Sequence, residues 1–351
     1  MQTPDFDIVA VGGCGMDIIM NVPDVTHMEI TDRNQVIRKY TALEFSSKCS
    51  VQSVLYAPGG SAANVACDAR CFGMRTAFIG KVGVDGNGGA CLNELSSRGV
   101  DISSVVRTPE DTTAVSVVLL TPYGADRSIL AYKGTTNLLT PADVNVDICR
   151  RTRCLAWTSL SSPKALEALL LAVETAKTAG ALISSAPSMA VIRQYPAIFG
   201  TLLTKSDVVS LNDDELKEFT KAQTVLGGIK HLLGMGLKLV SVTMGEKGSL
   251  ITDGRIIVET GVYPVQVKDT TGAGDAFATG LICGYLERLP LPEIAKRATA
   301  LAAMEVQVTG VRLGLPTNRE EVDTFLNHNT VQQRCHDFEQ VASSAAGLLG
   351  A

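Results

Sequence analysis

The sequence lacks several features that would indicate a nucleic-acid-binding, membrane or secreted protein. Lysine and arginine form no basic cluster, and 36 acidic residues outnumber 31 basic ones, so a phosphate-contacting surface is not expected. No apolar run approaches the roughly 20 residues that a membrane-spanning helix needs. The first residues contain neither the basic region nor the apolar segment of a secretory signal. We therefore expect a cytoplasmic protein that binds neither nucleic acid nor membrane.

The cysteines also lack the spacing of a zinc site or a disulfide framework. There are nine of them, an odd number, and none belongs to a Cys-x-x-Cys pair. Cys67 and Cys71 are one helical turn apart, but no histidine lies near them in sequence to complete a zinc site. Small buried thiols in a reducing compartment are the simplest interpretation.

The most informative segment covers residues 269–277, where small residues precede an acid that opens an apolar helical run. Gly272 and Gly274 allow a tight turn and leave backbone N–H groups unobstructed at the positive end of the helix, which suits anionic oxygens. Asp275 stands beside these groups as a proton acceptor. An anion site and a carboxylate base in one turn suit transfer of a phosphoryl group to a hydroxyl. A Gly-rich helix start with an incidental acid is the plain alternative.

This segment closely resembles the signature near the C-terminus of the ribokinase, or PfkB, family of sugar and nucleoside kinases. The resemblance implies that Asp275 is the catalytic base and that the backbone of Gly272, Ala273 and Gly274 forms the anion hole. It also implies ATP and Mg²⁺ as cofactors. Asp269 and Thr271 resemble positions that bind a monovalent cation in many relatives, so K⁺ is a further candidate.

The pattern of apolar segments predicts an α/β fold. From residue 153 onward, strand candidates alternate with helix candidates, which is typical of a doubly wound, mostly parallel sheet with helices on both faces. Ligands of such sheets bind outside the carboxyl ends of the strands. The strand candidates in this part lie at residues 154–157, 181–184, 207–211 and 237–242, and the clearest helix candidate lies at 164–178.

Two early segments do not fit this alternation and are expected to form a small β-sheet lid. Residues of about 18–57 are polar and irregular apart from a strand-like stretch at 49–56, and residues 113–133 suggest a hairpin. A lid would exclude water, which would otherwise compete for the phosphoryl group. We expect one kinase domain over residues 1–328, with residues 329–351 as a C-terminal tail for which one extra helix is a candidate.

Two further motifs resemble the substrate-binding positions of the family. Asp17 follows the Gly-rich turn after the first strand, and a carboxylate accepts paired hydrogen bonds from a vicinal diol. In residues 58–66, Gly59 and Gly60 let the backbone approach the substrate, while Asn64 offers a donor and an acceptor to its hydroxyls. A solvated aspartate in a turn and an ordinary helix N-terminus are the simpler alternatives.

Two motifs after later strands are candidates for the nucleotide site. Asn212 and Glu215 match the family's Asn-x-x-Glu motif, in which the pair organises Mg²⁺, largely through water, and the phosphates. The same spacing is an ordinary helix capping box, and both interpretations can hold together. Thr243, Gly245 and Gly248 resemble the family's Thr-x-Gly-x-x-Gly loop, which contacts ATP.

Together the motifs predict ATP-dependent phosphorylation of a hydroxyl on a small sugar or polyol, as in ribokinases and fructokinases. Lid strands often pair between subunits in the family, so a homodimer through the lid is a candidate assembly. Thr136 stands where relatives often have Asn, and Ser161 stands where ribokinases usually carry a sugar-binding Glu. These departures put ribose itself in doubt.

Three alternatives to a sugar kinase are open from the sequence. A nucleoside kinase of the adenosine type is the first, although adenosine kinases usually have Asn where Thr271 stands and an aromatic content of 5% leaves few rings for a purine. A nicotinamide-dependent dehydrogenase would need a third glycine after Gly13 and Gly15. A non-catalytic sugar-binding relative is disfavoured because Asp275 accompanies the Gly-Ala-Gly turn.

Overall fold

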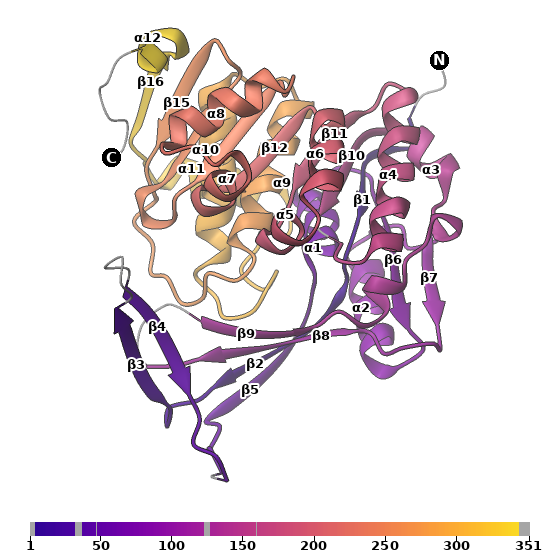
Figure 1. The fold of residues 1–351 in the computed structure, drawn as a ribbon. Coiled ribbons are helices and arrows are strands. Elements are labelled where there is room, and N and C mark those ends of the chain that lie inside the picture. Colours follow the sequence, from indigo (N-terminus) through magenta and orange to yellow (C-terminus); the bar gives the residue numbers. More distant parts are fainter. Residues whose placement is uncertain (1–3, 32–36, 47, 123–126, 159, 344–351) are drawn as a thin grey trace.

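The computed structural model describes residues 4–31, 37–46, 48–122, 127–158 and 160–343. Its centre is a ten-stranded sheet with the order β16-β15-β14-β13-β12-β11-β10-β1-β6-β7 (Figure 1). The strands from β7 to β13 pair in parallel, and β14, β15 and β16 add antiparallel strands at one edge. The strands are β1 (Phe6–Val11), β6 (Thr76–Gly83), β7 (Val105–Thr108), β10 (Thr152–Thr158), β11 (Leu182–Ala186), β12 (Val208–Asn212), β13 (Leu239–Thr243), β14 (Ser249–Thr252), β15 (Ile256–Thr260) and β16 (Gln333–Asp337).

Helices cover both faces of this sheet, as expected for a doubly wound fold (Figure 1). Alternate residues of each strand point to opposite faces, so Val9 packs against the layer of α4 and α6 while Ile8 packs against α1 and α9. The predicted fold class is therefore confirmed. The helices are α1 (Ser61–Asp68), α2 (Gly86–Ser97), α3 (Val146–Arg150), α4 (Pro163–Thr178), α5 (Met189–Gln194), α6 (Pro196–Lys205), α7 (Asp213–Thr220), α8 (Val225–Gly234), α9 (Ala273–Leu286), α10 (Leu291–Glu305), α11 (Arg319–His328) and α12 (Phe338–Ser343).

A second sheet of four strands, in the order β5-β2-β8-β9, lies below the carboxyl ends of the parallel strands (Figure 1). It is the predicted lid, and we call it the lid sheet. Beside it, β3 and β4 form a separate two-stranded arm. The lid and arm strands are β2 (Gly15–Asn21), β3 (Thr26–Thr31), β4 (Ile37–Ala42), β5 (Ser53–Gly59), β8 (Ala114–Leu120) and β9 (Arg127–Tyr132).

The early segment is more regular than the sequence predicts. Residues 18–57 contain most of β2 and β5 and the whole arm, because β2 pairs with β5 on one side and with β8, about a hundred residues later, on the other. Such distant pairing leaves no mark in a local pattern. The expected turn of the 113–133 hairpin falls at residues 123–126, outside the described residues.

The C-terminal segment contains a strand that the sequence does not predict, in addition to the one helix suggested for it. Residues Gln333–Asp337 form β16, which pairs antiparallel with β15, and α12 follows directly. The strand was missed because its sequence, QRCHD, is polar and sits at an exposed sheet edge. Residues 344–351 lie outside the described part. Among the described helices, none combines the length and the apolar character of a membrane span.

Candidate active site

A cavity of about 400 Å³ lies between the lid sheet and the carboxyl ends of β1, β10, β11, β12 and β13. The lid contributes Asp17, Ser116 and Ile129 to its wall, and the main sheet contributes Thr158 and Leu211. This is where parallel sheets place their ligands. The cavity also receives the start of α9, so it brings together the motifs that the sequence predicts far apart in the chain.

Asp275 lies in the first turn of α9 and faces this cavity. Its Oδ2 accepts a hydrogen bond of 2.6 Å from Asn64 Nδ2. Burial raises the pKa of the Asp275 carboxyl, while hydrogen bonds from Asn64 and Ser61 and the charge of Arg312 act in the opposite direction. The carboxylate is thus held in one orientation and has a stronger affinity for a proton than an exposed aspartate.

The turn before Asp275 has free backbone donors. Gly272 caps α9 with φ 81°, a left-handed conformation, and no side chain satisfies the helix N-terminus. In the described part of the chain, the N–H groups of Gly274 and Asp275 donate to no backbone carbonyl. Gly272 and Gly274 both line the cavity, so these donors lie where an anionic group can reach them.

Gly272 is required here for steric as well as conformational reasons. A Cβ at this position would lie 2.7 Å from Glu305 Oε1 and 3.0 Å from Val311 Cγ1. Around Gly274, by contrast, nothing lies within 4 Å of the position that a Cβ would take. The two glycines of the motif therefore have different functions in the fold.

The predicted substrate residues surround the other side of the cavity. Asp17, on β2, has a pKa raised to about 6, mainly by burial, with a hydrogen bond from Ser116 opposing the shift. Gly60 has φ 100° and packs directly on the backbone of Gly13 and Cys14. Gly59 does not line the cavity; a Cβ there would overlap the Asp17 carboxylate, so Gly59 makes room for that side chain.

The predicted nucleotide residues separate into two groups. Asn212, Glu215 and Thr243 line the cavity. Asn212 and Glu215 form a complete capping box for α7, with Glu215 N–H to Asn212 Oδ1 at 2.8 Å and Asn212 N–H to Glu215 Oε2 at 3.0 Å. Burial raises the pKa of Glu215 to about 7. Gly245 and Gly248 shape the turn between β13 and β14 and lie outside the cavity wall.

Asp269 is buried and acts locally on the loop that leads to the turn. Its Oδ1 accepts from the Thr271 N–H at 2.9 Å and from Thr271 Oγ1 at 2.6 Å, and its Oδ2 accepts from the Gly310 N–H at 3.1 Å. These bonds join the Gly272 turn to the loop after α10. Within the described residues, no group of three or more His, Cys, Asp or Glu side chains could hold a metal ion.

The sequence reasoning missed several residues that the fold brings to this region. Ser61 follows the Gly-Gly pair and bonds Asp275, which its position in the motif could have suggested. Arg127, on lid strand β9, donates to Thr270 Oγ1 next to the Gly272 turn. Arg312, from the loop after α10, lies behind the turn. No sequence signal indicates the last two, because the partners of their side chains are more than a hundred residues away.

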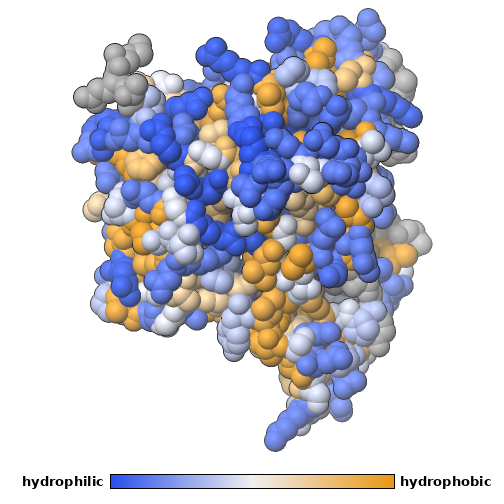
Figure 2. All heavy atoms as spheres, turned by 180° about the vertical axis from the view of Figure 1, so that it is seen from behind, coloured by the Kyte–Doolittle hydropathy of each residue, from blue (hydrophilic) through white to orange (hydrophobic). Residues whose placement is uncertain are grey.

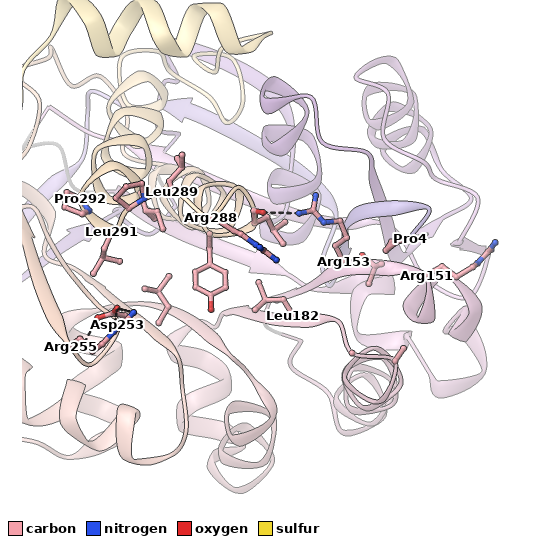
Figure 3. A pocket seen from close by; sticks show the side chains of 18 of the residues that line it. Pro4, Arg151, Arg153, Leu182, Asp253, Arg255, Arg288, Leu289, Leu291 and Pro292 are labelled. Carbon is pink, nitrogen blue, oxygen red and sulfur yellow. Dashed lines mark hydrogen bonds and ion pairs between the residues drawn. The ribbon is translucent and has the colours of Figure 1, made fainter. Parts of the chain in front are cut away.

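A larger hollow, of about 1600 Å³, lies at the opposite edge of the sheet, beside the amino ends of β10, β11 and β13 (Figure 3). Arg153, Arg255 and Arg288 project around it, and Arg153 donates to the Leu286 carbonyl at 3.0 Å. None of the predicted site residues lines this hollow. The chemistry of the Gly272 turn belongs to the smaller cavity.

Comparison with known proteins agrees with the geometry. The profile of the pfkB family carbohydrate kinases matches residues 16–318. The chain belongs to the PfkB carbohydrate kinase family. It is therefore a phosphotransferase with an alcohol group as acceptor.

Individual members of the PfkB family align over most of the chain. The chain is 30% identical to fructokinase-2 of Solanum habrochaites over 284 residues, covering 76% of this chain and 86% of the relative. It is 29% identical to the 2-dehydro-3-deoxygluconokinase of Bacillus subtilis over 315 residues, covering 85% and 96%. The fold matches an E. coli protein described as ribokinase II, solved with ATP and Mg²⁺, with a TM-score of 0.79 and 21% identity, covering 92% of this chain and 99% of that one.

Proposed function

We propose that this PfkB-family protein transfers the terminal phosphoryl group of ATP to a hydroxyl of a small sugar, of the fructokinase or ribokinase type. One observation carries the proposal: the Asp275 carboxylate and the free N–H groups of Gly274 and Asp275 face a single cavity closed by a lid. A base and an anion-binding turn that face the same cavity can act on one reacting hydroxyl and one phosphoryl group.

Asp275 takes the proton of the acceptor hydroxyl. Asn64 and Ser61 hold its carboxylate at the wall of the cavity. Its raised pKa strengthens it as a base, provided that it is ionised at the working pH. In the predicted anion hole of Gly272, Ala273 and Gly274, the Ala273 N–H already donates to the Thr270 carbonyl at 3.4 Å. The free N–H groups of Gly274 and Asp275 stabilise the negative charge on the phosphoryl oxygens during transfer.

The side of the cavity formed by Asn212, Glu215 and Thr243 suits the phosphates of ATP and its Mg²⁺. Carboxylate and amide oxygens are the donors that Mg²⁺ prefers, often through water, and Mg²⁺ supplies neutralisation of the phosphate charge. The pKa of Glu215, about 7, indicates a carboxylate that a nearby cation would keep ionised. Gly245 and Gly248 shape the turn beside this site. Asp269 and Thr271 are the candidate ligands of a monovalent cation such as K⁺.

A sugar fits the opposite side of the cavity better than a nucleoside does. Asp17 and Asn64 offer hydroxyl-binding groups, and Gly60 permits close approach of the backbone. Tyr132 is the single aromatic residue among the described residues of the cavity wall, so a purine would find little to stack on. The relatives named for fructose and for 2-dehydro-3-deoxygluconate support a sugar or sugar acid. A nucleoside kinase is the second candidate.

The outer face of the lid sheet suits pairing with a second copy. Asp17 points into the cavity, so neighbouring side chains on the opposite face, such as Tyr56 and Leu130, point outward, and both are 64% exposed. Figure 2 shows hydrophobic side chains gathered on the part of that view where the lid lies. A homodimer through the lid would cover this face. The catalytic unit would extend beyond the expected boundary at residue 328, because β16 is an edge strand of the main sheet and Phe338 packs in its core.

The test is release of ADP from ATP and Mg²⁺ with a panel of hexoses, pentoses, sugar acids and nucleosides. The proposal expects saturable turnover with at least one sugar or sugar acid and none with nucleosides. Turnover with a nucleoside alone would favour the second candidate. Binding of a sugar without any ADP release would instead indicate a non-catalytic relative.

A further inference from the structure

A buried arginine lies directly behind the catalytic turn and has no part in the proposed chemistry. Arg312 is 1% exposed and has a left-handed backbone, φ 67°. Its Nη1 lies 3.1 Å from Glu94 Oε2 and 3.1 Å from Cys67 Sγ. Within the described residues, its Nε and Nη2 have no hydrogen-bond partner. Burying a guanidinium with unpaired N–H groups costs free energy of folding, so a function that requires its charge or position would explain why it lies there.

Arg312 contacts residues on both sides of Asp275: Glu305, which packs against the Gly272 turn, and Cys67, which lies on α1. The backbone N–H of Arg312 donates to Glu305 Oε1 at 2.7 Å, and that oxygen lies against Gly272, where a Cβ would come within 2.7 Å of it. Cys67 is on α1, one helical turn after Asn64, the residue that bonds Asp275. Arg312 therefore connects the support of the anion-binding turn to the helix that orients the base.

The charge of Arg312 also acts on the cavity. Asp17 and Asp275 both face the cavity, and the charge of Asp275 raises the pKa of Asp17 and of Glu215 by repulsion. Lys133 is the single cationic side chain among the described residues of the cavity wall, and it is exposed. Arg312 lowers the pKa of both Asp17 and Asp275 from behind. In this region of low dielectric such an interaction is screened little.

Other acids pack around the guanidinium, and their charges matter to the balance. Burial raises the pKa of Asp68 and raises that of Glu305 to about 7, so these two carry less than a full negative charge near neutral pH. Glu94 is shared between Arg312 and Arg98, which lies 3.0 Å from its Oε1. The charged or titratable groups that face Arg312 are Cys14, Asp17, Cys67, Asp68, Glu94, Arg98, Asp275 and Glu305.

We propose that Arg312 is a positioning residue for phosphoryl transfer: it braces α1 against the Gly272 turn, and its buried positive charge offsets the repulsion between Asp17 and Asp275. The inference rests on the proposed function, in which Asp275 is the base. Arg312 touches neither substrate nor cofactor and acts through Glu305, Cys67 and its electric field.

The test compares the pH dependence of kcat/KM for the sugar, at saturating MgATP, in two variants, one of which removes a positive charge and the other a negative charge. Arg312→Met removes the positive charge, which should raise the pKa of Asp275. On the acid limb of the profile, where activity falls as the pH is lowered, the fall should therefore begin about half a pH unit or more higher than in the wild type. Arg312→Lys keeps the charge and should return the profile toward that of the wild type. Glu94→Gln removes the negative partner of Arg312 and should shift the same limb to lower pH.

Opposite shifts in Arg312→Met and Glu94→Gln support the proposal, because a loss of packing alone would not reverse sign. Unchanged profiles in both would overturn it, as would shifts in the same direction. If Arg312→Met does not fold, as judged by circular dichroism, Glu94→Gln decides alone: a limb that stays in place or moves to higher pH contradicts the proposal. A wrong assignment of Asp275 as the base would give a different result, because Asp275→Asn would then retain its turnover.

Discussion

Asn64 Nδ2 lies 2.6 Å from Asp275 Oδ2, although 211 residues separate the two in the chain. The bond joins the first turn of α1, next to the Gly59-Gly60 pair, to the first turn of α9. Asn64 is thus a hydrogen-bond partner of the carboxylate as well as a residue of the cavity wall. The two sequence motifs therefore work as one unit, with the amide orienting the acid.

Replacing Asn64 should lower the fraction of Asp275 that is ionised near neutral pH without removing the base. Burial is the largest influence on the pKa of Asp275 and raises it, and the Asn64 hydrogen bond is the first of the opposing effects. Asn64→Ala should therefore raise that pKa further and lower kcat roughly 10-fold to 100-fold near neutral pH, with partial recovery at higher pH. Steady-state kinetics from pH 6 to 9 measure this. A loss that stays constant with pH would mean that Asn64 acts only on substrate binding.

Replacing Asp275 itself should abolish most of the turnover while leaving binding largely intact. Asp275→Asn keeps the shape of the side chain but cannot take the proton, so kcat should fall by about 10²-fold or more. Sugar affinity, measured by calorimetry, should change little by comparison. Asp323→Asn, an exposed substitution on α11, is the matched control and should behave as the wild type. Near-full activity in Asp275→Asn would rule out its assignment as base.

The two glycines of the turn should respond differently to the same added methyl group. Gly272 has a left-handed backbone and contacts Glu305 and Val311, so Gly272→Ala should destabilise the protein by roughly 1–3 kcal/mol and lower activity. Gly274 lies in open space within the helix, so Gly274→Ala should keep or slightly raise the melting temperature. Thermal unfolding of the pair decides this, and equal melting temperatures would contradict the assignment of the cap.

The sequence predicted the fold class, the lid and the shared cavity because strand patterns and Gly-containing turns are local features. Asp275, Asn64 and Glu215 could be named since each stands in a short motif beside a strand or helix end. The pairing of β2 with β8 and the position of Arg312 could not, because both depend on segments brought together only by the folded sheet. The capping box at Asn212 shows how one pattern can carry a structural explanation and a functional hypothesis together.

Asp17 should show the opposing demands of stability and binding. Burial raises its pKa from 3.8 to about 6, so between these values the folded protein holds a proton that the unfolded chain has lost. The free energy of unfolding therefore falls as the pH rises through this window and stays lowered above it. Asp17→Asn removes this effect and should stabilise the protein at pH 7.5 by about 1–2 kcal/mol, with little change near pH 4.

Asp17→Asn should also bind sugar at least about tenfold more weakly, because it replaces a carboxylate acceptor of charge-assisted hydrogen bonds. Ser116→Ala is the matched control of opposite sign: its hydroxyl stabilises the ionised Asp17, so its loss should lower stability at pH 7.5. Urea denaturation at both pH values and calorimetric titration with the best sugar measure the two effects. If Asp17→Asn were less stable than the wild type at pH 7.5, the Asp17 carboxylate would be a net stabilising group, and burial would not be the dominant influence on it.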